Sequence, residues 1–160
     1  MAMINGCHWS SNGKFLLSTS NDMTAKVWNV KQCLSKGKIA ARGGKKNPGE
    51  EEDDEEGGKE KLRPVFDLPK EGERGHSAAV VKGEISPDGD YVVTCGKDNF
   101  IFLWNLKLNG AVDRQYKGHS DQVLNVHWNY DGSRIASCDH KGFVFIWDPK
   151  GESYQNQKSQ

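Results

Sequence analysis

The sequence has no long apolar run and no excess of charge of either sign, and these absences exclude several classes of protein. No apolar stretch is long enough to cross a membrane as a helix, and no secretory leader is recognisable. Lys and Arg together number 22, as do Asp and Glu, and basic residues do not alternate with aromatic ones along any predicted strand. We therefore expect an intracellular protein, of the cytoplasm or the nucleus, that neither binds membranes nor contacts nucleic acid directly.

Cysteine is also scarce. The four cysteines form no CxxC pair, and no group of His and Cys has the spacing of a zinc site, so the sequence predicts neither a metal site nor a cofactor. Cys95 and Cys138 each lie nine residues before a tryptophan. We expect both to be buried free thiols in the reducing interior of a cell.

Helical periodicity is the third absence. No stretch of ten or more residues repeats its apolar positions with a helical period. The chain instead alternates short β-prone runs with turns, as where Pro87–Gly89 precedes Tyr91–Cys95. Proline presets φ, and glycine takes the positive φ that such a reversal needs. The sequence therefore predicts an all-β fold built from hairpins.

Three tryptophans, Trp28, Trp104 and Trp147, each close one copy of the same pattern. A two-residue turn lies sixteen and fifteen residues before each of them: Asn12-Gly13, Asp88-Gly89 and Asp131-Gly132. A large apolar residue lies nineteen residues before each: Trp9, Ile85 and Trp128. A hydroxyl lies ten residues before each: Ser18, Thr94 and Ser137. A repeat with fixed spacing indicates an array of one supersecondary unit.

Two of the copies also begin alike, because Gly75-His76 and Gly118-His119 stand at the same distance before their tryptophans, 28 residues counted from the histidine. All three copies end on Trp-Asn or Trp-Asp, and 43 residues separate the last two tryptophans. These features resemble the WD-repeat β-propeller family, and the resemblance covers residues 4–30 and 75–149. It implies blades that are four-stranded antiparallel sheets, arranged around a ring.

The repeats divide the chain into five segments. We expect a truncated first repeat over 1–30, a charged insertion over 31–74, a second repeat over 75–106, a third repeat over 107–149 and a polar tail over 150–160. About three blades are too few to close a propeller, which needs about four to eight. We therefore expect an incomplete ring, as a fragment, a short isoform or one part of an assembled ring, whose open blade edges allow self-association.

The resemblance implies a hydrogen-bonded chain in each repeat, formed by His, Ser or Thr, Asp and Trp, that braces the strands of a blade. The second copy holds the full set: His76, Thr94, Asp98 and Trp104. The third copy holds three members of the set: His119, Ser137 and Trp147. Lys141 stands at the position of the aspartate, and Asp139 lies two residues before it. The first copy has no Gly-His and holds the remaining members: Ser18, Asp22 and Trp28.

A hydroxyl, a histidine and an aspartate also make up a catalytic triad, which needs an exposed nucleophile and an oxyanion hole. Because the same trio recurs at blade spacing, we interpret it as structural and expect no catalytic residue and no enzyme activity. Glu84 and Asp90 are interpreted as isolated, solvated carboxylates. The alternative is a hydrolase or enzyme-accessory propeller. Turnover of a substrate that disappears in a Thr94 or His76 variant that still folds would support this alternative.

The insertion has a composition of its own. Lys31–Lys46 is basic and rich in glycine, and Glu50–Glu56 is a run of seven acids. Blocks of like charge with few apolar residues predict a disordered loop. We expect it to leave the propeller between consecutive blades, with Val65–Pro69 returning as the outer strand of the next blade. The acids could dock a basic protein in a chromatin or ribonucleoprotein context, Lys45 and Lys46 could direct nuclear import, or the loop could simply be solvated.

The resemblance implies a non-catalytic scaffold for protein–protein interaction, a subunit of a larger intracellular assembly. Members of the family offer a rigid face built from turn residues and from residues just after the Gly-His pair. The matching positions are our partner-binding candidates: Asn21, Lys97, His140, Ser77, Ala79, Ser120 and Gln122. Lys97 and His140 give this face a mildly basic rim, which suits partner proteins or peptides that are acidic or phosphorylated. In the alternative, the charged loop is the binding element and the blades only display it.

Overall fold

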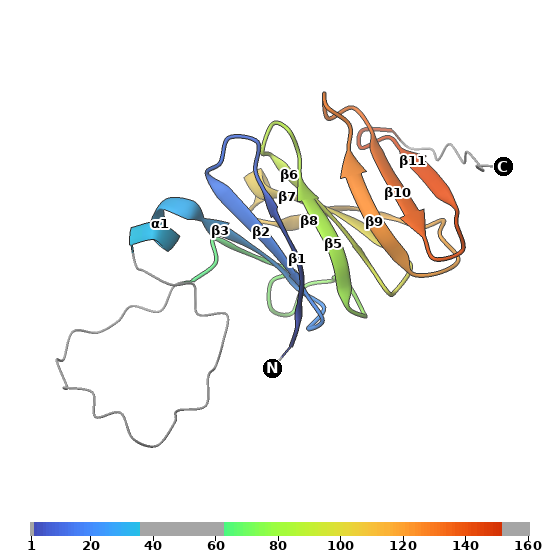
Figure 1. Ribbon diagram of the computed structural model, residues 1–160, viewed down its shortest axis with the longest axis horizontal. Coiled ribbons are helices and arrows are strands. Elements are labelled where there is room, and N and C mark those ends of the chain that lie inside the picture. Colours follow the sequence, from blue (N-terminus) through green and yellow to red (C-terminus); the bar gives the residue numbers. More distant parts are fainter. Residues whose placement is uncertain (1, 36–62, 152–160) are drawn as a thin grey trace, which may run out of the picture.

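The computed structural model describes residues 2–35 and 63–151, in which three antiparallel sheets stand side by side (Figure 1). The all-β fold and the WD-repeat blades predicted from the sequence are confirmed. Two short helical segments accompany the strands and were not predicted: α1 (Val30–Ser35) and the 3-10 helix η1 (Leu106–Leu108).

The first sheet contains four strands in the order β1 (Ile4–Trp9), β2 (Phe15–Ser20), β3 (Ala25–Asn29) and β4 (Phe66–Leu68). The second has the order β5 (Val80–Ile85), β6 (Tyr91–Gly96), β7 (Ile101–Asn105) and β8 (Ala111–Tyr116). The third holds three strands within the described residues: β9 (Val123–Trp128), β10 (Ile135–Asp139) and β11 (Val144–Trp147). Each first hairpin turns at a glycine of positive φ, such as Gly89 at 79°, as the repeated turn motif predicts.

The position of β4 corrects one expectation. Phe66 lies opposite Val27 of β3, so this strand completes the first sheet and is not the outer strand of the next blade. The strand that follows a tryptophan completes that tryptophan's own sheet, and β8 does the same in the second sheet. The charged insertion therefore lies between the third and fourth strands of one blade, and not between blades. The insertion predicted over 31–74 is described at its two ends, where α1 and β4 form, so disorder was wrongly expected at Lys31–Ser35. The rest of the predicted loop, with its acidic run, falls within residues 36–62 and lies outside the described residues, as do positions 152–160 of the polar tail.

Alternate side chains of the second sheet face opposite neighbours, as the period of a strand requires. Its most deeply buried side chains toward the first sheet, each at most 1% exposed, are Val92, Phe102 and Trp104. Those toward the third sheet are equally buried: Val93, Cys95, Ile101 and Leu103. Cys138, predicted to be as buried as Cys95, is only half-buried, because no described residue covers the face of the third sheet that carries it.

A carboxylate links the first strands of all three sheets. Glu84 Oε1 lies 3.0 Å from His8 Nε2 of β1 and 3.3 Å from His127 Nδ1 of β9, and Glu84 Oε2 accepts the Trp128 amide at 2.6 Å. Burial opposes ionisation of Glu84, but these hydrogen bonds and the two histidines outweigh it and hold its pKa below the ordinary value. The interpretation of Glu84 as an isolated, solvated carboxylate was wrong, because its contacts come from neighbouring sheets.

Candidate interaction surface

A chain of hydrogen bonds crosses the second sheet from Trp104 to Asp98. Trp104 Nε1–H donates to Thr94 Oγ1 at 2.8 Å, and His76 Nε2 lies 2.9 Å from the same oxygen. His76 Nδ1 lies 2.9 Å from Asp98 Oδ2. A neutral imidazole protonated on Nδ1 satisfies every group, because the Thr94 hydroxyl then donates to Nε2 and Nδ1–H donates to the carboxylate. With Thr94 0% exposed, each broken bond would leave a buried polar group unpartnered.

Asp98 ends this chain and holds two loops together. Its carboxylate also accepts the backbone amides of Ser77 at 2.9 Å and Phe100 at 3.2 Å. Burial opposes its ionisation, but the hydrogen bond from His76 and those from the two amides outweigh it, so the pKa of Asp98 lies below its ordinary value. The segment after the Gly-His pair is therefore fixed to the turn between β6 and β7.

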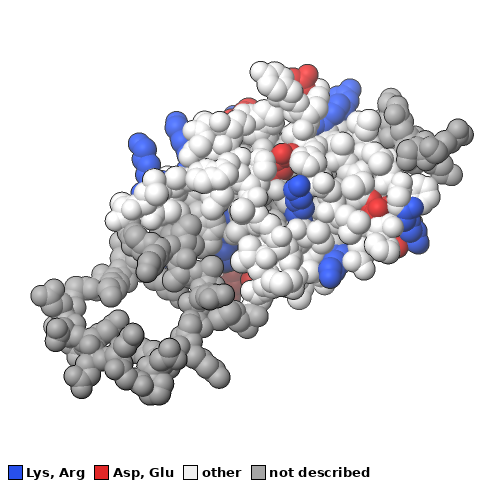
Figure 2. Space-filling view, in the orientation of Figure 1, with Lys and Arg blue, Asp and Glu red and all other residues white. Residues whose placement is uncertain are grey.

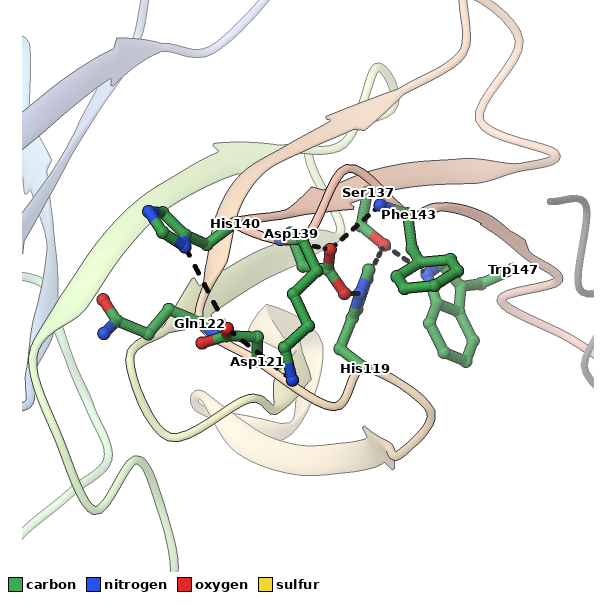
Figure 3. A network of polar contacts seen from close by, with 9 residues as sticks. His119, Asp121, Gln122, Ser137, Asp139, His140, Phe143 and Trp147 are labelled. Carbon is green, nitrogen blue, oxygen red and sulfur yellow. Dashed lines mark hydrogen bonds and ion pairs between the residues drawn. The ribbon is translucent and has the colours of Figure 1, made fainter. Parts of the chain in front are cut away.

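The third sheet repeats the chain with a different carboxylate (Figure 3). Trp147 Nε1–H donates to Ser137 Oγ at 2.8 Å, and His119 Nε2 lies 2.7 Å from that oxygen. His119 Nδ1 lies 2.8 Å from Asp139 Oδ2. The imperfect set expected from Lys141 was wrong: Asp139 supplies the acid from two residues earlier, and Lys141 is exposed.

The backbone of the turn explains how an earlier residue can serve. The Asn99 amide donates to the Gly96 carbonyl, and the Gly142 amide donates to the Asp139 carbonyl, so Asp139 and Gly96 occupy the same turn position. A Cβ on Gly96 would stand 2.8 Å from His76 Nδ1, in the space that the Asp139 side chain enters in the third sheet. The carboxylate can therefore approach the histidine from either of two turn positions, and glycine at the first leaves room for aspartate at the second.

A phenylalanine covers the histidine ring in both of these sheets, a feature that sequence reasoning missed. Phe102 lies edge-on to His76 with ring centroids 4.6 Å apart, and Phe145 does the same to His119 at 4.3 Å. Each phenylalanine also stacks on its tryptophan at 5.4 Å. The signal available in the sequence was phenylalanine two residues before the tryptophan in the two copies that contain a histidine.

The first sheet keeps only the tryptophan end of the chain. Trp28 Nε1–H donates to Ser18 Oγ at 2.9 Å. Asp22 caps its own turn, so the structure does not bring it together with Ser18 and Trp28. Lys26 takes the place of the phenylalanine and pairs with Asp67 at 2.6 Å.

The hydroxyls of the two complete chains are poorly placed for nucleophilic attack. Thr94 is 0% exposed and Ser137 is 3% exposed. Each receives an indole N–H and contacts a histidine, so its hydrogen-bonding groups are occupied. A substrate could reach neither oxygen without opening the sheet.

At one end of the sheets, the same backbone hydrogen bond occurs three times. In each sheet, the backbone amide of a turn residue donates to the carbonyl of the residue immediately before the first strand, at 2.9–3.0 Å. The three bonds run from Lys97 to Ala79, from His140 to Gln122 and from Asn21 to Met3. Two loops of each blade are thereby held side by side. The structure thus brings together candidates from two loops in the second and third blades, whereas in the first blade Asn21 is the single candidate.

Most of these candidates offer their side chains to solvent. Six are exposed and Ala79 is half-buried: Asn21, Lys97, His140, Ser77, Ser120 and Gln122. The Asn21 side chain is occupied, because its Oδ1 accepts from Asn5, which also donates to the Val80 carbonyl at 2.7 Å and so bridges the first two sheets. The ammonium group of Lys97 forms no ion pair with the residues that the structure describes.

Asp121 adds a negative charge to the third sheet at this end. Its Oδ2 lies 4.0 Å from His140 Nδ1 and 3.9 Å from Lys141 Nζ, and Figure 3 shows Asp121 and His140 on adjoining loops. Its negative charge therefore lies beside both side chains. The basic character predicted for the rim is therefore concentrated at Lys97.

Lys and Arg side chains are scattered over the face in view and gather into no broad patch (Figure 2). No helix among the described residues is long and apolar enough to span a membrane. Within residues 2–35 and 63–151, no group of three or more His, Cys, Asp or Glu side chains is arranged to hold a metal ion.

Comparisons with known proteins match this geometry. The family model WD40, described as WD domain, G-beta repeat, matches residues 2–29, 69–105 and 110–148. The chain is 29% identical over 105 residues to Protein HIRA homolog of Drosophila melanogaster, a match that covers 66% of this chain and 8% of that protein. Among solved structures it is similar to RRP9 WD40 repeats and to U3-55K, each with a TM-score of 0.72 and 18% identity over 98% of this chain. It spans 38% and 39% of those two chains.

Proposed function

This chain belongs to the WD40 repeat family, and we propose that it serves as a non-catalytic protein-interaction scaffold, a subunit of a larger intracellular assembly in the cytoplasm or the nucleus. Its binding face is the row of paired loops at one end of the sheets. We name this row the paired-loop surface, and its residues are Asn21, Lys97, His140, Ser77, Ala79, Ser120 and Gln122.

The observation that carries the proposal is the backbone bond that recurs in all three blades. Because each loop pair is tied by main-chain atoms at 2.9–3.0 Å, the side chains on it are free to vary without loosening the sheet. In the second blade the buried Asp98 fixes both loops from beneath. A backbone that is already held rigid loses little conformational freedom on binding, which favours a scaffold role.

The charge of this surface points to an acidic or phosphorylated peptide. Lys97 is exposed and forms no ion pair with the described residues, so its ammonium group can meet a carboxylate or phosphate without first breaking a contact. Ser77 and Gln122 supply neutral hydrogen-bonding groups beside the turns. Asp121 makes the third blade less attractive to an anion than the second.

The test is titration of the chain with a panel of acidic, phosphorylated and neutral peptides by fluorescence anisotropy. Lys97→Glu is expected to weaken the tightest acidic binder at least tenfold, because an attraction becomes a repulsion. Lys14→Glu is the matched control, since Lys14 is exposed on a turn at the opposite end of the sheet. Equal binding by both variants, or no preference for acidic over neutral peptides, would remove this surface as the acidic-peptide site.

A second candidate function rests on the seven consecutive acids of Glu50–Glu56. Here the insertion binds a basic protein and the blades display it. The two strands that flank the insertion pair directly, with the Val65 amide donating to the Val27 carbonyl at 2.7 Å, so deletion of residues 36–61 should leave the first sheet intact. A lysine-rich peptide is the probe for the insertion: binding that is lost on deletion and kept in Lys97→Glu favours the insertion. An acidic peptide that still binds the deletion variant but not Lys97→Glu favours the paired-loop surface.

A further inference from the structure

The first strands of the three sheets, β1, β5 and β9, are edge strands, and β5 lies next to both of the others. An edge strand carries amides that no strand of its own sheet accepts. The Ser86 amide, directly after β5, donates to a carbonyl of its own sheet, so the Ile85 amide before it points to the open edge. The Asn129 amide does the same directly after β9, so the Trp128 amide points outward as well. Both outward amides need an acceptor from another sheet.

Each of these amides is accepted by a side chain of the preceding sheet, from the same position of the repeat. His8 Nδ1 accepts the Ile85 amide at 3.4 Å, and Glu84 Oε2 accepts the Trp128 amide at 2.6 Å. His8 and Glu84 each lie twenty residues before the tryptophan that closes their own copy. One arrangement therefore joins both pairs of sheets, but the acceptor is an imidazole at the first junction and a carboxylate at the second.

The bond to Ile85 fixes the protonation of His8. A backbone amide can only donate, so Nδ1 carries no proton, and Nε2 carries the proton that it donates to Glu84 Oε1 at 3.0 Å. His8 is therefore a neutral imidazole in this arrangement. A protonated imidazole has no acceptor nitrogen, so protonation of His8 would set its Nδ1–H against the Ile85 N–H.

We propose that the junction between the first and second sheets is a pH-sensitive device, in which neutral His8 holds the open edge of β5 and protonated His8 releases the Ile85 amide. Histidine side chains ordinarily change charge between about pH 5 and pH 8. Glu84 remains an acceptor over that range, because its contacts hold its pKa below the ordinary value, so the second junction keeps its bond to Trp128. This inference rests on the two junctions and not on the proposed function.

The titratable side chains grouped with His8 come from both neighbouring sheets. Glu84 would attract a protonated His8 through Nε2–H, which restores no acceptor for the amide. His127 of β9 contacts the same carboxylate oxygen at 3.3 Å, and Lys82 Nζ of β5 lies 3.5 Å from His127 Nε2, where its charge opposes protonation of that ring. Within its own sheet, His8 pairs with Leu17 of β2, which carries no charge. The surrounding charges therefore act on Glu84 and His127 and leave the Ile85 amide dependent on His8.

The other end of the same junction does not titrate. Asn5 Nδ2–H donates to the Val80 carbonyl at 2.7 Å and joins β1 to the start of β5, beside the paired-loop surface. The side-chain amide keeps its donors and acceptor throughout the range in which histidine changes charge. Acid is therefore expected to loosen the junction at the His8 end and to leave the paired-loop surface intact.

Hydrogen exchange of single backbone amides, followed by NMR at about pH 7.5 and about pH 5.5, tests the proposal. Protection factors correct for the intrinsic exchange rate at each pH. We expect that of Ile85 to fall about fivefold or more at the lower pH, as the loss of one hydrogen bond implies, while that of Trp128 changes less than about twofold. The fall should follow the titration of the His8 ring, which its own proton signals report.

Two variants attribute the change to one histidine. His8→Asn can place its side-chain oxygen near the position of Nδ1 and is not protonated in this range, so Ile85 should be equally protected at both pH values. His127→Asn is the matched control: it removes the other histidine that contacts Glu84 and should leave the fall at Ile85 in place. Near-UV circular dichroism shows that both variants stay folded.

The wild-type chain alone can overturn the proposal, through an Ile85 protection factor that is the same at both pH values or a fall that is as large at Trp128. A fall that persists in His8→Asn, or one that disappears in His127→Asn, overturns it as well.

Discussion

The second and first sheets are copies of one unit, yet they hold their tryptophans in different ways. In the second, Trp104 is fully buried and ends a four-membered chain of hydrogen bonds beneath Phe102. In the first, Trp28 is half-buried and keeps one bond, to Ser18, while Lys26 takes the phenylalanine's place. The histidine and its aromatic cover are present together or absent together.

That difference follows from the cost of burying polar groups. An imidazole inside a sheet needs a partner for each nitrogen, and the low local dielectric makes a missing partner expensive. A face open to water has no such requirement, because water supplies the partners. The complete chain therefore stabilises a blade whose tryptophan is covered by a neighbouring sheet, as in the second and third sheets, and the shorter chain suits the first sheet, whose tryptophan is only half-buried.

The largest effect is expected from Thr94→Val, which removes the hydroxyl shared by Trp104 and His76 while keeping its shape. Two buried nitrogens lose their partner, so the free energy of unfolding should fall by about 2–4 kcal/mol. Ser18→Ala, the corresponding change in the first sheet, should cost only about 0.5–1.5 kcal/mol. Urea unfolding followed by tryptophan fluorescence measures both, and equal losses would contradict the account of why the two sheets differ.

The two carboxylate positions allow a rescue experiment. Asp139→Gly leaves His119 Nδ1 without its acceptor and should cost about 2–3 kcal/mol. Adding Lys141→Asp recreates the arrangement of the second sheet, with glycine first and aspartate two residues later, and should return stability to within about 1 kcal/mol of the wild type. Lys141→Asp alone is the control. A double variant no more stable than Asp139→Gly would show that the turn positions are not interchangeable.

The repeat itself was readable from the sequence, because turn glycines, strand propensity and the tryptophan spacing are local features. The role of Asp139 was not readable, since only the backbone of the turn shows that its first position, glycine in the second sheet, lies as close to the histidine as the later position of Asp98. The three-residue strand β4 was assigned to the wrong sheet because the insertion separates it from β3. The contacts of Glu84 depend on how neighbouring sheets align, which no local pattern records.

A smaller effect is expected from Glu84→Gln, which tests the link between the sheets through its pH dependence. Because the fold lowers the pKa of Glu84, its ionised form stabilises the protein above the ordinary pKa, and this contribution is lost as the pH falls through the lowered value. The variant should therefore cost about 1 kcal/mol at pH 7 and much less near pH 3. Urea unfolding at both pH values, with exposed Asp113→Asn as the control, measures the difference. A cost that is equal at the two values would contradict the assignment.

The smallest effect is expected from Lys26→Ala in the first sheet. The side chains of Lys26 and Asp67 are 36% and 46% exposed, so water and salt screen their attraction. The loss should stay below about 1 kcal/mol and shrink further in concentrated salt. Urea unfolding at two ionic strengths checks this, and a loss comparable to that of Thr94→Val would place the ion pair on a level with the buried chain.

We propose that the paired-loop surface, held by a brace beneath it, is where this chain binds its partner. The most direct measurement is a map of backbone amide shifts by two-dimensional NMR as the tightest acidic peptide is added. We expect the largest shifts to cluster at Lys97 and Ser77 and to extend to Gln122, with the turn around Lys14 unchanged. Shifts centred on the opposite end of the sheets, or confined to residues 36–62, would contradict it.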